Sequence, residues 1–323
     1  MGGKMRAAVP IDGEIELAEV PVPEPGPREV LVAVHAAGMN RADLLHRRGR
    51  YRQQAFRRPG SPDIAGLEFA GEIAAVGADV REATVGRRVM AMCGGAYAEY
   101  VAVDERLLLP SPDGLQSADC AALPMALLTE FEALVRLAGF HSGDRVLVTG
   151  ATSSAGLAGV QLAHCLGAEV VATTRSLHAD SLLRDVGADL VVHNESELAE
   201  QTGSTGVDIV IDHVGGAMFE ASVTVARTRA RLVSVGRLGG RSASLDLADL
   251  AARRARVTGT TWKNQTLDEI AACVDEFRRV AQPLVDAGRI KPVTGRRIQF
   301  ADIRSGYEHL TAPREPGKPV VIF

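Results

Sequence analysis

The sequence predicts an α/β protein that combines a doubly wound parallel sheet with a second, β-rich domain. Between Asp144 and Thr261, six short apolar runs alternate with helical segments, as strands and crossover helices do. A turn of small residues, 150–156, separates the first of these runs from its helix. Residues 5–110 instead form short apolar or alternating runs separated by proline and glycine, which favours a partly closed barrel.

The expected elements follow this division. Strands of the parallel sheet are predicted at 145–149, 169–174, 190–193, 208–213, 230–235 and 255–260. Strands of the β-rich part are predicted at 6–9, 14–20, 30–35, 69–76, 88–92 and 98–103, with a helical period over 117–137. The remaining chain predicts a helix at 267–287, a strand at 293–297, a helix at 301–312 and a strand at 319–323. The sheet domain, 121–261, is therefore expected to be inserted in a substrate domain made of 1–120 and 262–323.

The small-residue turn is a candidate phosphate-binding site. In a G-x-G-x-x-G frame the three positions are Ala151, Ser153 and Gly156, so only the third glycine is present. The small side chains would let a ligand's phosphates approach the backbone, and the next helix would direct its N-terminal N–H groups at an anion. The predicted contacts are Thr152, Ser153, Ser154, Ala155 and Gly156. An ordinary turn of another α/β protein remains the alternative.

The second strand of the sheet bears on the choice of cofactor. It ends in Thr174-Arg175-Ser176, where NAD-dependent enzymes place Asp or Glu to hold the ribose 2′-hydroxyl. An arginine there suits a 2′-phosphate, which predicts NADP(H), although a surface arginine without a ligand is the alternative. Val214, Gly236 and Leu238 follow the fourth and fifth strands, where such sheets bind ligands, or serve there as simple turn residues.

Composition narrows the functional classes. The chain has 323 residues, 46% of them hydrophobic, and a net charge of −4, which disfavours binding to nucleic acid or to a membrane surface. No apolar run approaches the roughly 20 residues of a membrane span, and the first residues lack a signal-like apolar core. The four cysteines are scattered, which is typical of reduced thiols in a cytoplasmic protein; Cys93 is expected to be a small buried hydrophobe. No G-x-S-x-G motif points to a serine hydrolase.

Three stretches carry a family resemblance: Asn40 to Tyr51 (Asn-Arg-Ala-Asp-Leu-Leu-His-Arg-Arg-Gly-Arg-Tyr), Gly94 to Val101, and Ala121 to Thr129. Together with Asp212-His-Val-Gly-Gly216 and the small-residue turn, they resemble the quinone oxidoreductase, zeta-crystallin-like branch of the medium-chain dehydrogenases/reductases. The resemblance implies a GroES-like catalytic domain, a Rossmann domain, NADPH bound between them, and a homodimer. The strand at 254–261 is the expected sheet edge at which the partner binds.

The resemblance also assigns roles to residues. In zinc-dependent members a Cys and a Gly-His-Glu segment ligate the metal, whereas this chain has Asn40 and Gly66-Leu67-Glu68, so no metal is expected. Tyr51, Asn40 and Asp43 match a motif at the nicotinamide end of the site, and Tyr51 is the expected hydrogen-bond donor to substrate. Asn40 and Asp43 are equally well explained as caps. Thr129 is expected on the nicotinamide ribose, with a helix cap as the alternative.

Two further features qualify the resemblance. The positions of the family's phosphate-binding Lys and Tyr hold Ala179 and Asn194 here, so Arg175 and Ser176 would have to replace them. The arginine-rich segment 47–58 is expected to be a solvated loop, or else to attract an anionic substrate. The predicted function is NADPH-dependent hydride transfer to a quinone or an activated enone. Reduction of enoyl thioesters and a non-catalytic, NADPH-binding role remain the alternatives.

Overall fold

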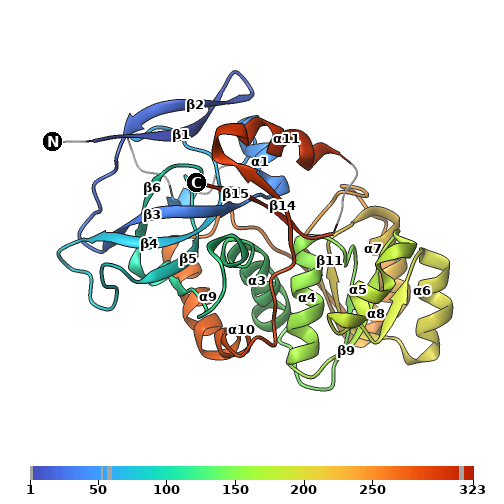
Figure 1. The fold of residues 1–323 in the computed structure, drawn as a ribbon. Helices are drawn as coiled ribbons and strands as arrows, with labels where there is room; N and C mark the ends of the chain where they lie inside the picture. Colours follow the sequence, from blue (N-terminus) through green and yellow to red (C-terminus); the bar gives the residue numbers. More distant parts are fainter. Residues whose placement is uncertain (1–2, 52–53, 57–59, 313–315) are drawn as a thin grey trace. The chain divides into compact units, whose positions relative to one another are not determined.

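The computed structural model describes residues 3–51, 54–56, 60–312 and 316–323, and the chain divides into two compact units (Figure 1). The first is formed by Met1–Met125, Trp262–Asp286 and Pro292–Phe323, and the second by Ala126–Thr261 with Ala287–Lys291. The short segment of the second unit is fixed by Gln161, whose side chain donates to the Lys291 carbonyl at 3.1 Å and accepts from the Lys291 N–H at 2.8 Å.

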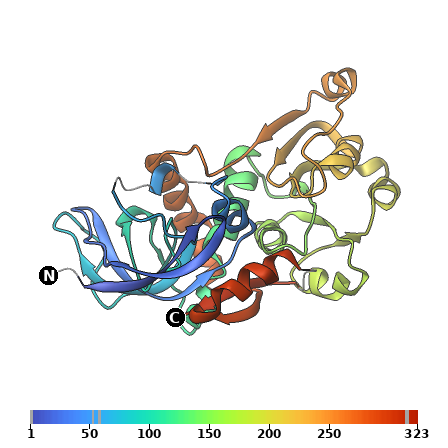
Figure 2. The same ribbon diagram turned by 90° about the horizontal axis from the view of Figure 1, so that it is seen from above.

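A seven-stranded sheet forms the body of the first unit. Its strands are β3 (Glu29–Gly38), β4 (Glu68–Val76), β5 (Arg88–Met92), β6 (Tyr100–Asp104), β7 (Leu109–Pro110), β14 (Thr294–Gln299) and β15 (Lys318–Ile322). The order is β14-β15-β3-β4-β5-β7, and β6 pairs with β3. A separate hairpin contains β1 (Lys4–Ile11) and β2 (Glu14–Pro21). Seen from above, the blue and cyan strands curve together (Figure 2). All of the predicted strands in this part of the chain are confirmed, with ends shifted by a few residues.

The last strand of the chain lies beside one of the first. β15 pairs antiparallel with β3, and Met39, just after β3, donates its N–H to the Pro319 carbonyl at 2.8 Å. The pairing has a physical basis in the sequence, since both strands are apolar and β-branched, and both are largely buried. It brings Lys318, at the start of β15, close to the end of β3.

Helices of the first unit are mostly short: α1 (Arg41–Arg47), α2 (Ser117–Cys120), α9 (Leu267–Val280), α10 (Gln282–Asp286) and α11 (Ile303–Thr311), with 3-10 turns η1 (Gln54–Phe56), η2 (Glu105–Leu107) and η6 (Phe300–Asp302). The single helix predicted at 267–287 is wrong. It is two helices, because Pro283 has no N–H with which to continue the ladder of α9. α9 begins at a capping box in which Thr266 and Glu269 satisfy each other's backbone N–H groups.

The second unit contains a six-stranded, all-parallel sheet. Its strands are β8 (Arg145–Val148), β9 (Glu169–Thr173), β10 (Leu190–Val192), β11 (Val207–Asp212), β12 (Ala226–Ser234) and β13 (Arg256–Gly259). Their order, β10-β9-β8-β11-β12-β13, reverses between β8 and β11, as in a doubly wound dinucleotide-binding fold. Val146, Leu147 and Val148 are fully buried, as predicted for a strand covered on both faces. β13 is the edge strand, as predicted.

Helical segments precede the first strand of this unit and connect the later strands. They are α3 (Pro124–Phe131) with its π-helical continuation η3 (Glu132–Leu137), α4 (Ser154–Cys165), η4 (Leu177–Ala179), α5 (Asp180–Asp185), α6 (Glu195–Thr202), η5 (Gly203–Thr205), α7 (Gly216–Thr224) and α8 (Leu247–Arg253). The predicted helical span 117–137 is thus three segments, interrupted before Pro124. Within the described ranges, no helix is both long enough and apolar enough to cross a bilayer.

Candidate functional site

A buried cluster of Lys318, Glu68 and Asn40 includes both segments that the family resemblance compares with zinc ligands. The ammonium of Lys318 pairs with the carboxylate of Glu68, and both side chains are at most 2% exposed. Asn40 completes the cluster, because its Oδ1 accepts from Lys318 Nζ at 3.0 Å and its Nδ2 donates to Glu68 Oε1 at 2.7 Å. The second Glu68 oxygen accepts the N–H of Met125 at 2.8 Å. Gly38 makes room for this carboxylate, since a Cβ there would lie 2.5 Å from Glu68 Oε1.

The chemistry of this cluster is unsuited to a cation. An amide, a buried leucine (Leu67) and an ammonium ion take the places near Glu68, and a resident positive charge already neutralises the carboxylate. Across the described part of the chain, no three His, Cys, Asp or Glu side chains gather as a metal site would require. The Asn40 amide is also occupied, since its nitrogen lies 3.4 Å from the Gly38 carbonyl as well as contacting Glu68. Sequence reasoning missed Lys318 because 250 residues separate it from Glu68.

Asp43 is fully buried and anchors the start of α1. Its Oδ2 accepts the Asn40 N–H at 2.7 Å and lies 2.7 Å from the hydroxyl of Tyr97. Burial raises the pKa of Asp43 to about 7, even though the hydrogen bonds from Tyr97 and Asn40 oppose the shift. The other oxygen, Oδ1, has no hydrogen-bond partner among the described residues. The capping role is therefore present in the structure, and the carboxyl would exchange a proton near neutral pH.

Tyr51 is partly exposed and lies against Lys263. The Lys263 ammonium is 5.0 Å from the centre of the Tyr51 ring and donates to the Arg50 carbonyl at 2.9 Å. Within the arginine-rich segment, Arg47 does not extend into solvent: it packs 5.6 Å over the Tyr307 ring and pairs with Glu14 at 3.4 Å. The segment also includes Arg52, Arg57 and Arg58, which lie outside the described residues.

Cys93 follows β5 and is 2% exposed. Burial, reinforced by the charge of Glu68, raises the pKa of its thiol well above the usual range. A thiol that resists ionisation is a poor nucleophile, so Cys93 is the small buried hydrophobe expected from the sequence.

In the second unit, the small-residue turn leads into α4. Ser153 is the N-cap, and its Oγ accepts the Gly156 N–H at 3.0 Å. A Cβ on Gly156 would lie 2.6 Å from the Gly150 carbonyl oxygen, so a side chain there would break the contact between turn and helix. The side chains of residues 152–155 are small and partly exposed at the start of a 12-residue helix. This arrangement fits the pyrophosphate of a dinucleotide.

The segment after β9 lies next to this turn. The Thr174 hydroxyl is 3.4 Å from the Thr152 hydroxyl and accepts the Ser176 N–H at 3.1 Å, whereas Arg175 is exposed. The positions at which the resemblance expects Lys and Tyr have other tasks here. Ala179 is buried, and Asn194 caps α6 by accepting the Glu197 N–H at 2.9 Å.

His213, just after β11, pairs with Glu130 of α3, and sequence reasoning predicted no such pair. His213 is 8% exposed by its side chain, and its Nε2 lies 2.7 Å from Oε1 of the fully buried Glu130 in α3. Its Nδ1 lies 2.8 Å from the Thr149 carbonyl oxygen. Burial alone would lower the pKa of His213, but the charge and hydrogen bond of Glu130 outweigh it, so the pKa is raised.

The remaining predicted contacts differ in exposure. Thr129, next to Glu130, and Val214, next to His213, are both partly buried. Gly236 packs against the His213 carbonyl so closely that a Cβ would overlap it. Leu238 is 65% exposed. Three of these residues therefore adjoin the Glu130–His213 pair, and Leu238 stands at the surface.

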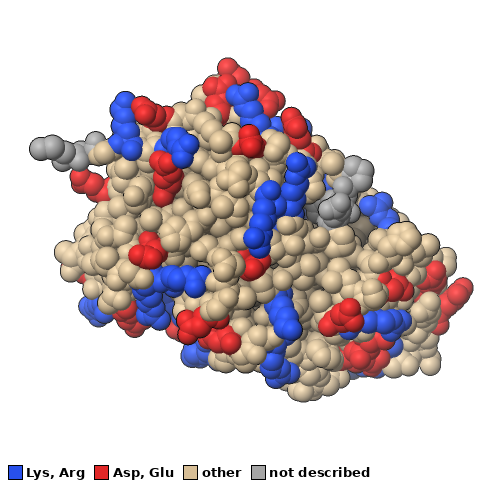
Figure 3. Space-filling view, in the orientation of Figure 1, with Lys and Arg blue, Asp and Glu red and all other residues tan. Residues whose placement is uncertain are grey.

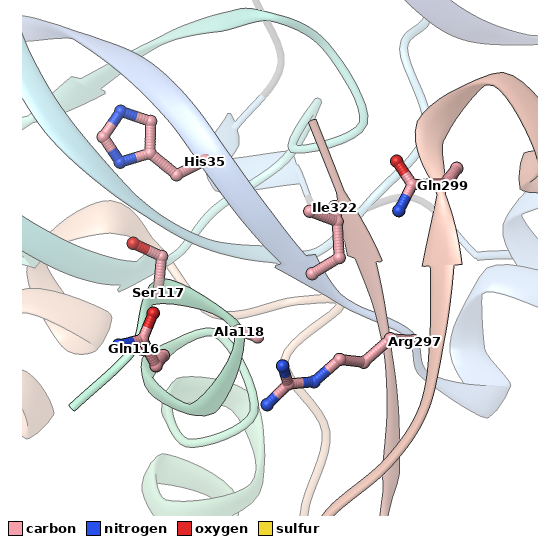
Figure 4. A pocket seen from close by; sticks show the side chains of 7 residues that line it. All are labelled: His35, Gln116, Ser117, Ala118, Arg297, Gln299 and Ile322. Atoms are coloured by element: carbon pink, nitrogen blue, oxygen red, sulfur yellow. The ribbon is translucent and has the colours of Figure 1, made fainter.

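The first unit also contains a separate hollow of about 300 Å³ (Figure 4), lined by His35, Gln116, Ser117, Ala118, Arg297, Gln299 and Ile322. None of the predicted site residues lines it. Arg297, which comes from β14, is 57% exposed by its side chain and lies 3.7 Å from Asp119. Elsewhere on the face shown in Figure 3, acidic and basic side chains are interspersed rather than gathered into one large patch of a single sign.

Comparison with known proteins matches both units. Residues 26–113 match the alcohol dehydrogenase GroES-like domain, and residues 155–277 match the zinc-binding dehydrogenase family. Quinone oxidoreductase-like protein 2 of Mus musculus is 31% identical over 310 residues, which cover 94% of this chain and 86% of that protein. An alcohol dehydrogenase superfamily protein of Novosphingobium aromaticivorans has a similar structure, with a TM-score of 0.87 at 29% identity, covering 99% of this chain and 100% of that one.

A relative of a different size extends the comparison. The spectinabilin polyketide synthase system protein NorB of Streptomyces orinoci is 31% identical over 315 residues, which are 95% of this chain. The chain spans only 14% of the length of that protein.

Proposed function

Since the chain belongs to the quinone oxidoreductase-like branch of the medium-chain dehydrogenase/reductase superfamily, whose members are nicotinamide-dependent oxidoreductases, we propose that it reduces a quinone or an activated enone with NADPH and without zinc. The observation that carries the proposal is the Lys318–Glu68–Asn40 cluster. At the two positions compared with zinc ligands, Glu68 is paired with an ammonium ion and Asn40 offers an amide. Without a metal, a substrate carbonyl would have to be polarised by hydrogen bonds alone.

The class of hydride acceptor that we propose follows from this reliance on hydrogen bonds. NADPH supplies the hydride when bound, and a proton completes the reduction. One hydrogen-bond donor to a developing oxyanion is typically worth about 3–4 kcal/mol of barrier. A conjugated acceptor spreads the incoming charge and suits such a site, whereas a simple ketone concentrates it on one oxygen. Tyr51 is the proposed donor. Asn40 and Asp43 are proposed to hold the site in shape and not to contact the substrate, because their side chains already form hydrogen bonds with other protein groups.

Substrate tests address the proposal directly. Purified protein should oxidise NADPH with quinones and enones faster than with simple ketones or alcohols, and chelators should not lower the rate. Tyr51→Phe should lower kcat by about 10²–10³-fold if its hydroxyl stabilises the oxyanion. Faster turnover of unactivated ketones, or stoichiometric zinc whose removal abolishes the activity, would refute the proposal. An unchanged rate in Tyr51→Phe would show that Tyr51 is not the donor and would leave the proposed reaction standing.

The preference for NADPH over NADH rests on Arg175 and Ser176 at the end of β9, where no acidic residue stands. Thr152–Gly156, Thr174, Thr129, Val214, Gly236 and Leu238 are the other proposed cofactor contacts. Arg175→Ala should weaken NADPH binding and leave NADH binding unchanged, with Arg184→Ala, on α5, as the control arginine. Equal effects on the two cofactors would contradict the assignment.

Reduction of enoyl thioesters is a second candidate, favoured by the similarity of nearly the whole chain to NorB. A parallel assay of quinones, enones and enoyl thioesters distinguishes the candidates by the highest kcat/KM. NADPH binding without turnover of any acceptor would favour a non-catalytic role.

We also propose a homodimer formed through β13. This edge strand is exposed along most of its length, and Val257 is 44% exposed. Val257→Lys should shift a dimer towards monomer in sedimentation experiments, and a monomeric wild-type protein would contradict the proposal. The free cysteines, the net charge of −4 and the interspersed charges on the face drawn in Figure 3 support a cytoplasmic protein that binds neither nucleic acid nor membranes.

A further inference from the structure

The Glu130–His213 pair joins segments that are distant in the sequence. Glu130 lies in α3, His213 follows β11, and the two are 83 residues apart. His213 contacts Thr149 twice. Its ring Nδ1 contacts the Thr149 carbonyl oxygen, and its backbone N–H donates to the Thr149 hydroxyl at 2.9 Å. Thr149 immediately precedes the turn, so one buried imidazole fixes where the turn begins.

Hydrogen-bond chemistry determines the proton count of the pair. A carbonyl oxygen only accepts, so Nδ1 of His213 must carry a proton. The remaining ring nitrogen, Nε2, faces Glu130 Oε1, and one further proton must lie between them. The imidazolium–carboxylate form satisfies both contacts. Removing that proton leaves a lone pair facing a buried carboxylate, which is repulsive.

The surroundings leave the pair little freedom to rearrange. A Cβ on Gly159 in α4 would overlap Glu130 Oε2, and one on Gly236 would overlap the His213 carbonyl. Asp212, the other charged group beside the imidazole, is held by the Thr149 hydroxyl at 2.7 Å and by the Gly215 N–H at 2.9 Å. The contacting positions on α4 and after β12 are glycines, so they add no ionisable group.

We propose that Glu130 and His213 form a positioning pair that aligns the three cofactor-contacting segments and makes nicotinamide cofactor affinity depend on the proton they share. The inference rests on the proposed cofactor site. Thr129 adjoins Glu130, Val214 adjoins His213, and the phosphate-binding turn follows Thr149. When the proton is lost at high pH, these segments separate and the affinity falls.

Two substitutions distinguish the effect of the shared proton from the effect of the Glu130–His213 contact itself. In Glu130→Gln the amide can donate to Nε2 of a neutral imidazole, so the contact is kept without the shared proton. In His213→Gln the buried carboxylate of Glu130 loses its cation. Asp208→Asn is the matched control: Asp208 pairs with Arg227 and accepts the Arg145 N–H at the opposite end of the same strand, β11.

The experiment is a fluorescence titration of the full chain with NADPH across pH 6 to 10, combined with a thermal unfolding curve for each variant. We expect the Kd of the wild type and of Asp208→Asn to rise at least about fivefold at the alkaline end, the lower bound of typical site coupling. The Kd of Glu130→Gln should stay constant, and that of His213→Gln should be raised at every pH.

The outcomes separate the two proposals. A wild-type protein that binds neither NADPH nor NADH would overturn both. If NADPH binds, and Glu130→Gln follows the wild-type pH profile, the positioning role is wrong while the cofactor site stands. The same holds if a folded His213→Gln binds NADPH as tightly as Asp208→Asn does.

Discussion

Each unit of this protein buries an ion pair between distant segments, and the two pairs differ in chemistry. In the first unit, Lys318 meets Glu68 across 250 residues, and the cation is an ammonium with an additional amide partner in Asn40. In the second, His213 meets Glu130 across 83 residues, and the cation that we propose is an imidazolium. The Lys318 ammonium is held by both Glu68 and Asn40, whereas the second pair contains histidine, the side chain that most readily exchanges a proton near neutral pH. These differences fit the two proposals made above: a substrate site without zinc in the first unit, and a cofactor affinity that depends on a shared proton in the second.

The largest expected effect is on the Lys318–Glu68 pair. Lys318→Met leaves the buried Glu68 carboxylate without a cation, which should cost about 3–5 kcal/mol of the free energy of unfolding. Urea unfolding measures this loss, and adding Glu68→Gln to the same chain should recover most of it. The control is Lys4→Met, because Lys4 and Glu19 form a pair that is 71% and 67% exposed and is worth about 0–1 kcal/mol. Similar losses in the two lysine variants would contradict the comparison.

The second prediction concerns a titratable group inside the first unit. The pKa of Asp43 is about 7 in the folded protein against 3.8 for the free side chain, so the folded state favours the protonated form. This stability is fully present below pH 4 and is lost as the pH rises through 7. At about 1.4 kcal/mol per unit, the upper limit is about 4 kcal/mol.

Urea unfolding of wild type and Asp43→Asn at pH 5 and pH 8 isolates this contribution. The stability of the wild type relative to Asp43→Asn should fall between the two pH values. Asp275→Asn provides the control, since Asp275 forms an exposed helical pair with Arg279. A difference that stays constant with pH would show that Asp43 is ionised throughout.

These buried groups mark the limit of prediction from the sequence. The parallel sheet could be predicted because its strands and crossover helices recur along a continuous stretch, and the role of Gly156 follows from a local motif. Lys318, by contrast, stands at the start of an ordinary apolar strand, and only the pairing of β15 with β3 brings it to Asn40. A lone Lys near the end of a chain carries no signal of burial.

In the second unit, the buried charged pair was also hard to predict from the sequence, although more signals point to it. His213 lies inside the Asp212–Gly216 motif, which contributes to the family resemblance, and Glu130 directly follows the predicted ribose contact Thr129. A charged residue among apolar neighbours in a helix is a usable signal, since a buried carboxylate needs a partner. The single helix predicted at 267–287 is wrong for a local reason, because Pro283 lacks the N–H that would continue α9.

A third prediction tests the packing around the second pair. Alanine usually stabilises a helix by about 1 kcal/mol relative to glycine. In Gly159→Ala the new methyl group would overlap Glu130 Oε2, so we expect a loss of about 1–3 kcal/mol instead. Gly306→Ala in α11 is the matched helical control from the first unit, because its methyl group would meet the flexible end of Met39 at 2.6 Å. A stabilised Gly159→Ala would show that Glu130 can move away.

The smallest expected effect separates structure from chemistry at Tyr51. Its ring lies 5.0 Å from the Lys263 ammonium, a cation–π contact worth about 0.5–1 kcal/mol at an exposed site. Lys263→Met should therefore lower the free energy of unfolding by about that amount. Tyr51→Phe keeps the ring and with it the contact to Lys263, yet it removes the hydroxyl that we assign to the oxyanion. The two variants should therefore differ in what they lose: the free energy of unfolding falls in Lys263→Met, and kcat falls in Tyr51→Phe. If Tyr51→Phe instead loses stability and keeps its kcat, the residue belongs to the framework of the first unit, and the donor must be sought elsewhere.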